Sequence, residues 1–395
     1  MPMNSELKPK IRFKGFTDDW EQRELKDIGD ILTGSTPSTQ HEEYYSQNGM
    51  LWVTPTDIDS NIIKNTAKKL SDEGLKVARI VPANTILVTC IASIGKNALT
   101  LEKSSFNQQI NSLTPYKEYN PYFILTESSI WSKKMKQQGA SGMMQMINKN
   151  EFSELETFVP NKQEQDKIGE LFTNLDNLIT LHQRKCDKLV ELKKSLLEKM
   201  FPQNNSVIPE IRFKGFTNDW EQRKLEDITQ IVMGQSPDSI NYTDNSDDTV
   251  LIQGNADLNN GIVVPRIWSS QITKKSYPND IIFTVRAPVG EIARNPYYAT
   301  IGRGVASFKG NDFLYQSLIQ KKENNYWNNI SAGSTFDSIN SDQLKNVIIY
   351  LPKNNLEQEK IGELFTNLDN LITLHQCKYD KLNKIRQSLL NDMFI

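Results

Sequence analysis

The sequence has few of the residues that carry out catalysis or hold metals. Its 395 residues include three histidines and three cysteines, and Cys90, Cys186 and Cys377 lie far apart. This set fits neither the clustered ligands of a zinc site nor the even count of a disulfide framework, and it is typical of a reducing compartment. We therefore expect no metal site and no disulfide in the chain.

Long apolar runs and an excess of charge are also missing. No run approaches the ~18 apolar residues of a membrane helix, and the N-terminal MPMNSELKPK has no apolar core like that of a signal peptide. We expect a cytoplasmic protein without a membrane span. The 46 basic and 48 acidic side chains give a net charge of −2. No overall positive field favours nucleic acid, which counts against a simple DNA-binding protein.

Two motifs resemble cofactor-binding loops but are incomplete. IASIGKN at 91–97 resembles a phosphate loop, but Cys90 replaces its first glycine and Asn97 its final Ser or Thr. NPYF at 120–123 and NPYY at 295–298 resemble the NPP[FY] site of adenine methyltransferases. Each has one proline and no glycine-rich loop upstream, so we interpret both as Asn-Pro turns. The sequence thus predicts no catalytic residues, and we expect the chain to perform no chemistry alone.

The sequence instead contains an internal duplication. Lys167–Gln183 reads KIGELFTNLDNLITLHQ, and Lys360–Gln376 is identical. A leading block, IRFKGFTDDWEQR at Ile11–Arg23, returns at Ile211–Arg223 with one substitution. The residues between these blocks differ in length and in sequence. Two identical surfaces indicate two copies of one partner, or a pairing of the repeats with each other, whereas two diverged domains indicate two different targets.

Each helical repeat begins a long amphipathic helix. Apolar residues recur at three- and four-residue intervals, which predicts one apolar face along a helix of about 40 residues. The residues of this stripe are Ile168, Leu171, Leu175 and Leu178 in the first copy and Ile361, Leu364, Leu368 and Leu371 in the second. Since the second domain is built after the first helix, the simplest arrangement returns the second helix antiparallel to the first, with the domains at opposite ends.

The sequence predicts an α+β fold for the region before each helix. Short apolar runs at Leu51–Val53, Ile86–Ile91, Val250–Gln253 and Ile281–Val285 are typical of strands, and Tyr122–Gln137 and Phe313–Asn325 are typical of helices. Gly139–Met146 and Ser331–Ser338 are predicted loops. The expected domains are 1–160 with the leading block 11–23, a helix over 161–201, a linker over 202–210, 211–352 with the leading block 211–223, and a helix over 353–395.

These repeats resemble a known family, the specificity subunit of type I restriction–modification enzymes. The resemblance covers nearly the whole chain. It rests on FKGFTDDWEQ, the GSTP and GQSP turns, FNQQIN at 106–111, RAPVGE at 286–291, IGRG at 301–304, and EQ before KIGELFTNLDNLI in both halves. The family has two target recognition domains joined by two long antiparallel helices, in a tandem repeat with pseudo-twofold symmetry.

The resemblance also implies the function. The helices would bind two copies of an adenine-N6 methyltransferase subunit, which carries S-adenosylmethionine. Two motor–nuclease subunits that use ATP and Mg would join for cleavage, so this chain itself would hold no cofactor. Each recognition domain would read one half of a bipartite, asymmetric site in double-stranded DNA. The methyltransferase subunits would supply much of the phosphate neutralisation that a chain of net charge −2 lacks.

Candidate base-reading residues follow from the chemistry of the major groove. Asn and Gln pair with adenine N6/N7, and Arg pairs with guanine O6/N7. The candidates are Ser35, Thr36, Lys96, Asn107, Gln108 and Gln109 in the first domain and Gln235, Ser236, Arg286 and Arg303 in the second. For each residue the alternative is a side chain that stabilises its own turn. Two other functions stay open: a coiled-coil scaffold that binds proteins without nucleic acid, and a bivalent DNA-binding protein that acts alone.

Overall fold

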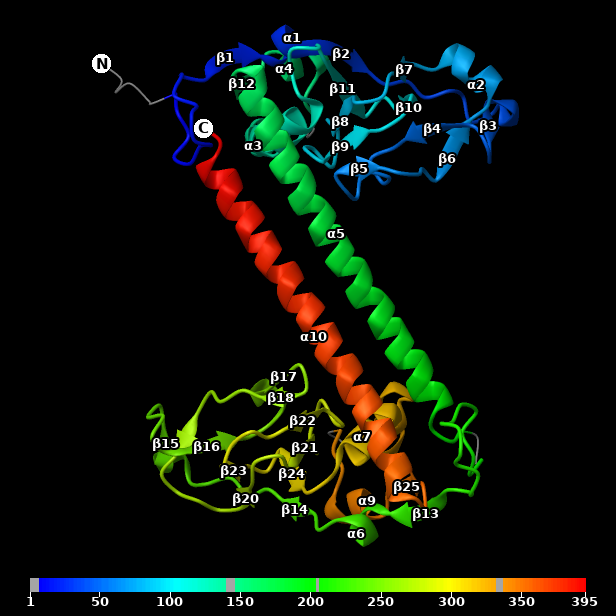
Figure 1. The fold of residues 1–395 in the computed structure, drawn as a ribbon, viewed down its shortest axis with the longest axis vertical. Coiled ribbons are helices and arrows are strands. Elements are labelled where there is room, and N and C mark those ends of the chain that lie inside the picture. Colours follow the sequence, from blue (N-terminus) through cyan, green and yellow to red (C-terminus); the bar gives the residue numbers. More distant parts are fainter. Residues whose placement is uncertain (1–6, 140–145, 204–205, 332–336) are drawn as a thin grey trace. The chain divides into compact units, whose positions relative to one another are not determined.

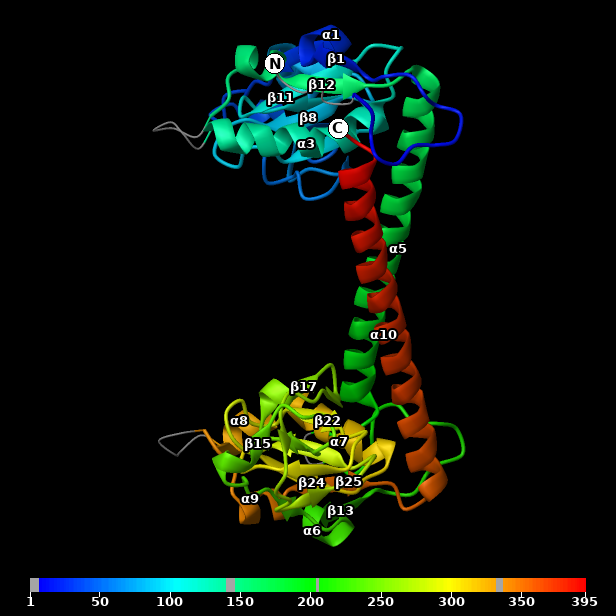
Figure 2. The same ribbon diagram turned by 90° about the vertical axis from the view of Figure 1, so that its left-hand side faces the viewer.

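The computed structural model describes residues 7–139, 146–203, 206–331 and 337–395. Its contacts divide the chain into two compact units (Figures 1 and 2). Unit 1 comprises the chain up to His182 together with Cys377–Ile395, and unit 2 comprises Gln183–Gln376. The division falls inside both long helices rather than at their ends. Each unit therefore contains one α+β domain, one half of its own helix and one half of the other.

The domain of unit 1 contains two five-stranded sheets. One has the order β2-β11-β8-β9-β5 and the other β3-β6-β4-β10-β7. The strands of the first are β2 (Gly29–Thr33), β11 (Ile110–Pro115), β8 (Ile86–Thr89), β9 (Asn97–Thr100) and β5 (Ile62–Ile63). Those of the second are β3 (Tyr45–Ser46), β6 (Lys68–Leu70), β4 (Met50–Val53), β10 (Ser104–Phe106) and β7 (Ile80–Val81). All four residues of β8 are buried, as expected for a central strand rich in β-branched residues.

Short helices and a strand pair complete this domain. Its helices are α1 (Leu25–Ile28), α2 (Asp72–Val77), α3 (Pro121–Gly139) and α4 (Lys149–Ser153), and β1 (Glu21–Glu24) pairs antiparallel with β12 (Glu156–Val159). Asn120 caps α3 by accepting hydrogen bonds from the backbone N of Tyr122 and Phe123 at 2.9 and 3.0 Å. This confirms that NPYF forms an Asn-Pro turn at a helix start.

Unit 2 repeats the plan with different strand lengths. A six-stranded sheet has the order β14-β24-β21-β22-β18-β17, and a five-stranded sheet has the order β15-β19-β16-β23-β20. The first contains β14 (Val232–Met233), β24 (Val305–Phe308), β21 (Ile281–Thr284), β22 (Ile292–Arg294), β18 (Ile262–Val263) and β17 (Leu258–Asn259). The second contains β15 (Tyr242–Thr243), β19 (Trp268–Ser269), β16 (Thr249–Ile252), β23 (Ala299–Ile301) and β20 (Lys275–Ser276).

The remaining elements of unit 2 resemble those of unit 1, except that its described residues contain no helix at the place of α2 and that two helices stand in place of α3. Its helices are α6 (Leu225–Ile228), α7 (Asp312–Glu323), α8 (Tyr326–Ser331) and α9 (Ser341–Lys345). The strand β13 (Glu221–Lys224) pairs antiparallel with β25 (Ile348–Leu351). The strands and helices that the sequence predicts in both domains are confirmed to within a few residues. Most of the predicted loop over Gly139–Met146, and residues 332–336 of the second loop, lie outside the described residues.

The two long helices are α5 (Lys162–Lys199) and α10 (Asn355–Asp392), each of 38 residues or about 57 Å. Their halves pair antiparallel within each unit. In unit 1 Arg386 Nε donates to Asp176 Oδ1 at 2.5 Å, and Phe172 contacts Phe394, which follows α10. In unit 2 Lys193 Nζ donates to Asp369 Oδ1 at 2.6 Å. None of the helices in the described ranges is both long and apolar enough to cross a membrane.

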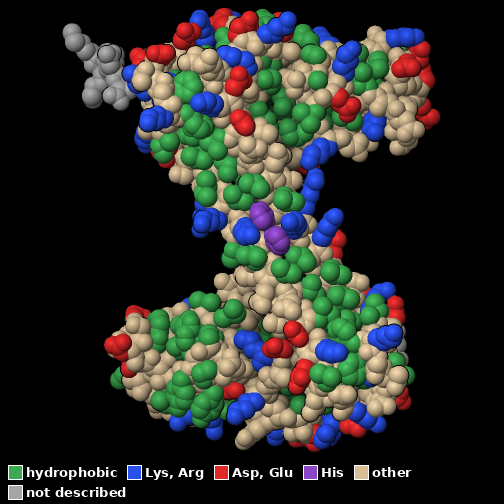
Figure 3. All heavy atoms as spheres, viewed as in Figure 1, with side chains coloured by type: hydrophobic (Ala, Val, Ile, Leu, Met, Phe, Trp, Pro, Cys, Tyr) green, Lys and Arg blue, Asp and Glu red, His purple; other side chains and the backbone are tan. Residues whose placement is uncertain are grey.

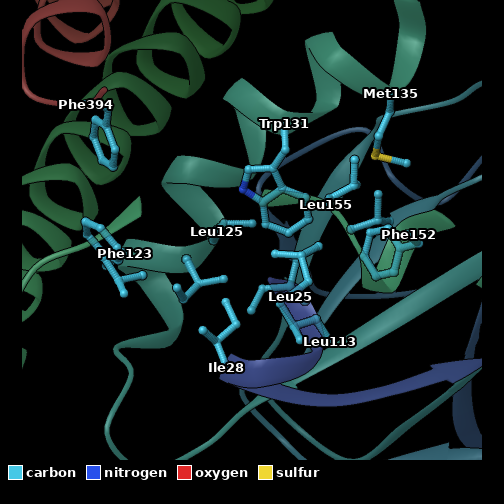
Figure 4. Packing of buried hydrophobic residues seen from close by; sticks show 14 of the residues in the cluster. Leu25, Ile28, Leu113, Phe123, Leu125, Trp131, Met135, Phe152, Leu155 and Phe394 are labelled. Atoms are coloured by element: carbon cyan, nitrogen blue, oxygen red, sulfur yellow. The ribbon is translucent and has the colours of Figure 1, made fainter. Parts of the chain in front are cut away.

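The core of unit 1 lies between its helices and the first sheet. Figure 4 shows Leu25 and Ile28 of α1 pointing toward Leu125 and Trp131 of α3, with Phe152 of α4 beside them. The same cluster extends to Ile168 and Phe172 of α5 and to Leu390, Met393 and Phe394 at the end of α10. The helix halves are thus part of the domain core and are not separate from it.

The repeated blocks contact each other inside each unit. Arg12 of the leading block binds Glu164 of α5 through two hydrogen bonds, at 2.8 and 2.7 Å, and the Glu164 side chain is fully buried. In unit 2 Arg212 binds Glu357 of α10 in the same way, at 2.6 and 2.8 Å. Because a planar guanidinium binds a carboxylate through two parallel bonds, each pair fixes orientation as well as distance.

A second contact joins the leading block to the end of the other helix. Trp20 packs edge-on against Phe394 with ring centroids 5.9 Å apart, and the backbone N of Ile11 donates to Asp392 O at 2.8 Å. In unit 2, Trp220 packs against Phe201 at 6.0 Å, and Ile211 N donates to Lys199 O at 2.9 Å. Each leading block therefore holds together the start of one long helix and the end of the other.

We predict that Arg12→Ala destabilises unit 1 by about 3–5 kcal/mol, because it leaves the Glu164 carboxylate buried without its partner. Lys76→Ala, which removes one member of the exposed Lys76–Glu73 pair, should cost less than about 1 kcal/mol. Urea unfolding, followed through the hydrogen exchange of unit 1 amides, gives the loss in free energy of unfolding for each variant. Equal losses would show that the Arg12–Glu164 pair does not hold the unit together.

Candidate functional site

The predicted reading turns of unit 1 lie in direct backbone contact. Gly34 N donates to Ile110 O at 3.0 Å and Ser35 N donates to Phe106 O at 2.9 Å. A Cβ at Gly34 would stand 2.0 Å from Asn107 O, so only glycine permits this approach. The GSTP turn and the FNQQ turn, some 70 residues apart in sequence, are therefore one structural feature.

Unit 2 contains the same feature. Gly234 N donates to Val305 O and Gln235 N to Ile301 O, both at 2.9 Å, and a Cβ at Gly234 would stand 2.0 Å from Gly302 O. We call these features the paired turns. They comprise residues 34–36 with 107–109 in unit 1, and residues 234–236 with 302–304 in unit 2. The sequence kinship of GSTP and GQSP thus reflects a shared backbone contact.

The structure divides the candidates of unit 1 into two kinds: committed side chains, which hydrogen-bond within the domain, and available ones, which are exposed. Asn107 is buried and uses both ends of its amide, accepting from Gln109 N at 2.9 Å and donating to Gln109 Oε1 at 3.1 Å. Ser35 Oγ accepts a hydrogen bond from Arg79 N at 2.8 Å. Asn107 thus stabilises its own turn, as the alternative interpretation held, and Ser35 ties its turn to the backbone of Arg79.

The available side chains of unit 1 lie beside them. Thr36 and Gln108 are exposed on the paired turns, and Gln109 is half-buried. Lys96 is exposed in the neighbouring hairpin, with its Nζ 3.5 Å from Pro55 O. Gln108 is exposed and therefore stays a candidate for contact with a base edge.

In unit 2, three of the four candidates are exposed. Ser236 Oγ is used by the turn, since it accepts from Arg303 N at 3.1 Å. Gln235, Arg286 and Arg303 are exposed, and the hydrogen bond of Val285 N to Gly304 O at 2.9 Å brings the two arginine positions together. Among the residues that the structure describes, neither guanidinium forms an ion pair. Arg303 on the paired turns of unit 2 and Arg286 beside them are therefore two exposed arginines without an ion pair among the described residues.

Sequence reasoning missed Arg79. Its backbone N donates to Ser35 Oγ, and its exposed guanidinium donates to Thr33 O. Arg79 therefore lies against the paired turns of unit 1. Nothing in the sequence near Arg79 points to the GSTP turn. The contact arises because β7 is an edge strand of one sheet while Thr33 ends β2 of the other, which strand patterns alone do not predict.

The surroundings of the paired turns contain no activated nucleophile. Cys90 N donates to Gln109 O at 2.8 Å, but burial raises the pKa of the Cys90 thiol to about 12, so it is not a thiolate at neutral pH. IASIGKN leads into strand β9 and not into a helix, which differs from a phosphate loop. Across the described ranges, no group of His, Cys, Asp and Glu is placed to hold a metal ion.

A second candidate surface lies on the long helices. Of the stripe residues predicted to bind a partner, Ile168, Ile361 and Leu368 are buried in the domain cores, Leu175 is also buried, and Leu171 and Leu364 are half-buried. The prediction is corrected for the buried four. Their stripe turns inward because each helix half completes the core of a domain, a role that the helical period does not reveal.

The exposed leucines of the repeat are different. Leu178 and Leu181 are 43% and 45% exposed, and their copies Leu371 and Leu374 are 43% and 46% exposed. Figure 3 shows apolar side chains at the surface along the long helices, between basic ones. Contacts within the units explain why Phe172 and Asp176 are kept in both copies, but exposed leucines have no such internal reason. These identical, exposed leucines are therefore the candidates for a docking surface on each copy.

Comparison with protein families gives a match over most of the chain. A model described as "Type I restriction modification DNA specificity domain" matches residues 17–191 and again 217–384. Each match contains one α+β domain with its paired turns and most of the long helix that follows it.

Individual proteins agree with this match. The chain is 27% identical over 401 residues to a protein of Methanocaldococcus jannaschii named as the type I restriction enzyme MjaX specificity subunit, covering 95% of this chain and 92% of the relative. It is 32% identical over 150 residues to the HindI specificity subunit of Haemophilus influenzae, covering 36% of this chain and 32% of that one. The fold is similar to the S subunit of a type I restriction–modification system from M. genitalium. That match has a TM-score of 0.64 and 16% identity, and covers 98% of this chain and 99% of the other.

We predict that neighbouring residues of one turn differ sharply in their effect on folding. Asn107→Ala should destabilise unit 1 by about 1–3 kcal/mol, because it leaves the buried Gln109 backbone N without its acceptor. Gln108→Ala, at an exposed position, should change stability by less than about 0.5 kcal/mol. Urea unfolding of the two variants tests this, and equal effects would contradict the division into committed and available side chains.

Proposed function

Because the chain belongs to the family of type I restriction–modification DNA specificity domains, we propose that it selects the DNA sequence on which a type I restriction–modification complex acts. It is a specificity subunit with two recognition domains, each with its own paired turns. A scaffold that binds proteins without DNA is not favoured, since both halves of the chain match a DNA specificity domain. The occurrence of the paired turns twice, with different side chains on one backbone, carries the proposal.

In this proposal each domain reads one half of a bipartite, asymmetric target. The backbone contact between the turns is the same in both units, but the exposed side chains differ: Thr36 and Gln108 in one, Gln235 and Arg303 in the other. Different donors at equivalent positions would select different bases. The two half-sites would then be separated by bases that the chain does not read.

The chemistry belongs to the partners in this proposal. The chain contributes only the recognition of the target sequence, and it neither methylates nor cleaves DNA. Two adenine methyltransferase subunits would bind S-adenosylmethionine, and two restriction subunits would use ATP and Mg. A net charge of −2 supports this division, because phosphate neutralisation would come largely from the partners. We assign the assembly to the cytoplasm as part of the same proposal.

The two exposed leucine pairs support the number of methyltransferase subunits. Each pair lies on a surface identical in sequence to the other, so a partner that fits one also fits the second. One subunit on Leu178 and Leu181 and another on Leu371 and Leu374 would give two per chain. Removing one pair should leave one subunit bound.

We predict that Leu178→Glu with Leu181→Glu reduces the purified complex from two methyltransferase subunits to one. Leu371→Glu with Leu374→Glu should do the same, and all four changes together should abolish assembly. Both pairs are exposed, so folding should be unaffected. The mass of the co-purified complex, measured by light scattering, gives the count.

The control is Ile240→Glu, which also replaces an apolar residue with a glutamate, at a residue 90% exposed on the unit 2 domain. This variant should keep two subunits. If the variant with all four leucines replaced still bound two subunits, the docking surfaces would lie elsewhere on the chain.

A further inference from the structure

The paired turns of the two units can be matched residue by residue through their hydrogen bonds. In unit 1, Asn107 N donates to Val53 O at 2.9 Å, and Ile110 N donates to Asn107 O at 3.1 Å. In unit 2, Gly302 N donates to Ile252 O at 2.7 Å, and Val305 N donates to Gly302 O at 3.2 Å. Each turn therefore opens at an equivalent residue. It follows that Gln108 and Arg303, one residue further on, occupy the same position in the two turns.

A second pair of positions matches in the same way. Cys90 N donates to Gln109 O at 2.8 Å, and Val285 N donates to Gly304 O at 2.9 Å. The residues that follow, Ile91 and Arg286, are also equivalent in their pairing. Ile91 forms an antiparallel bridge with Met146, and Arg286 forms one with Ser338.

The same two positions thus carry opposite chemistry in the two domains. Unit 2 has exposed arginines at both, and neither forms an ion pair within the described part of the chain. Unit 1 has an exposed glutamine at one and the half-buried Ile91 at the other, beside Met146, which is 43% exposed. One surface offers guanidinium donors, and the other offers one amide flanked by apolar side chains.

These differences correspond to different base pairs. A guanidinium donates two hydrogen bonds to guanine O6 and N7, whereas a glutamine amide both donates and accepts, as adenine N7 and N6 require. An apolar side chain contacts the C5-methyl group of thymine. The surface of unit 2 therefore suits G·C pairs, and the surface of unit 1 suits A·T pairs.

We propose that Arg303, together with Arg286, reads guanine in the half-site of the second domain, while Gln108, flanked by Ile91 and Met146, reads an A·T pair in the half-site of the first. This inference rests on the proposed function, since it assigns base classes to half-sites that the function supplies. Asn107 holds the turn that presents Gln108, and Ser236 holds the turn that presents Arg303.

The experiment uses the chain co-purified with its methyltransferase subunit and a pool of randomised DNA duplexes. Bound duplexes are sequenced for the wild type and for Arg303→Gln, Arg286→Gln and Gln108→Arg. Arg303→Gln and Arg286→Gln each remove a bidentate contact. Each should lower the discrimination for guanine about tenfold or more at one position of one half-site, with the other half-site unchanged. Gln108→Arg should raise the preference for guanine at one position of the opposite half-site.

The control is Lys309→Gln, which removes one positive charge from the same domain at the far end of β24 from its turn. Its motif should equal that of the wild type. If Arg303→Gln weakened binding to all sequences equally, the arginine would contact phosphate and the inference would be wrong. If the wild type selected no bipartite motif, the proposed function itself would fail, and the two failures are distinct.

Discussion

A buried arginine–glutamate pair holds each domain to its long helix, and the rest of the arrangement depends on it. Arg12 with Glu164, and Arg212 with Glu357, connect residues about 150 positions apart in sequence, with both oxygens of each carboxylate occupied. A buried carboxylate without its partner is strongly unfavourable, so the leading block cannot leave the helix without a large loss of free energy. The pair thereby fixes how the recognition domain sits on its helix.

This constraint explains much of the duplication. The leading block contacts the start of the long helix through the Arg–Glu pairs, just before each helical repeat. It contacts the repeat itself through Lys167 over the ring of Phe16 and Lys360 over the ring of Phe216, at 5.2 and 5.4 Å, which gives a physical reason for keeping both blocks alike. Keeping this contact requires keeping the residues of both the leading block and the helix. The exposed leucines lie outside this contact, and the proposal assigns them to a partner subunit. The paired turns lie between the repeated blocks, in the part of the sequence that differs between the two halves. Side chains can change there without disturbing the contact between the leading block and the helix.

The sequence alone predicted a large part of this structure, and the reasons are local. The long helices follow from an uninterrupted apolar period, and the α+β domains follow from β-branched runs such as the one in β8. The contact between the GSTP and FNQQ turns is a finding of the structure. The sequence could not show that Ile168 and Leu175 face inward, because a helical period gives a face but not its neighbour. It also could not separate Asn107 from Gln108, since hydrogen bonds across a turn decide which amide is free. The equivalence of Arg286 with Ile91 is visible in the sequence, where ILVTCIASIGK at 86–96 is similar to IIFTVRAPVGE at 281–291, and the hydrogen bonds of Cys90 and Val285 confirm it.

The central claim is that the two recognition domains read DNA independently. The most direct measurement is a genome-wide map of N6-methyladenine in cells that carry this chain with its methyltransferase partner. One strain has the natural chain, and the other has residues 24–150 replaced by the corresponding segment of another family member. The account predicts a bipartite motif in which one half changes and the other half is retained. A motif in which both halves change together would contradict it.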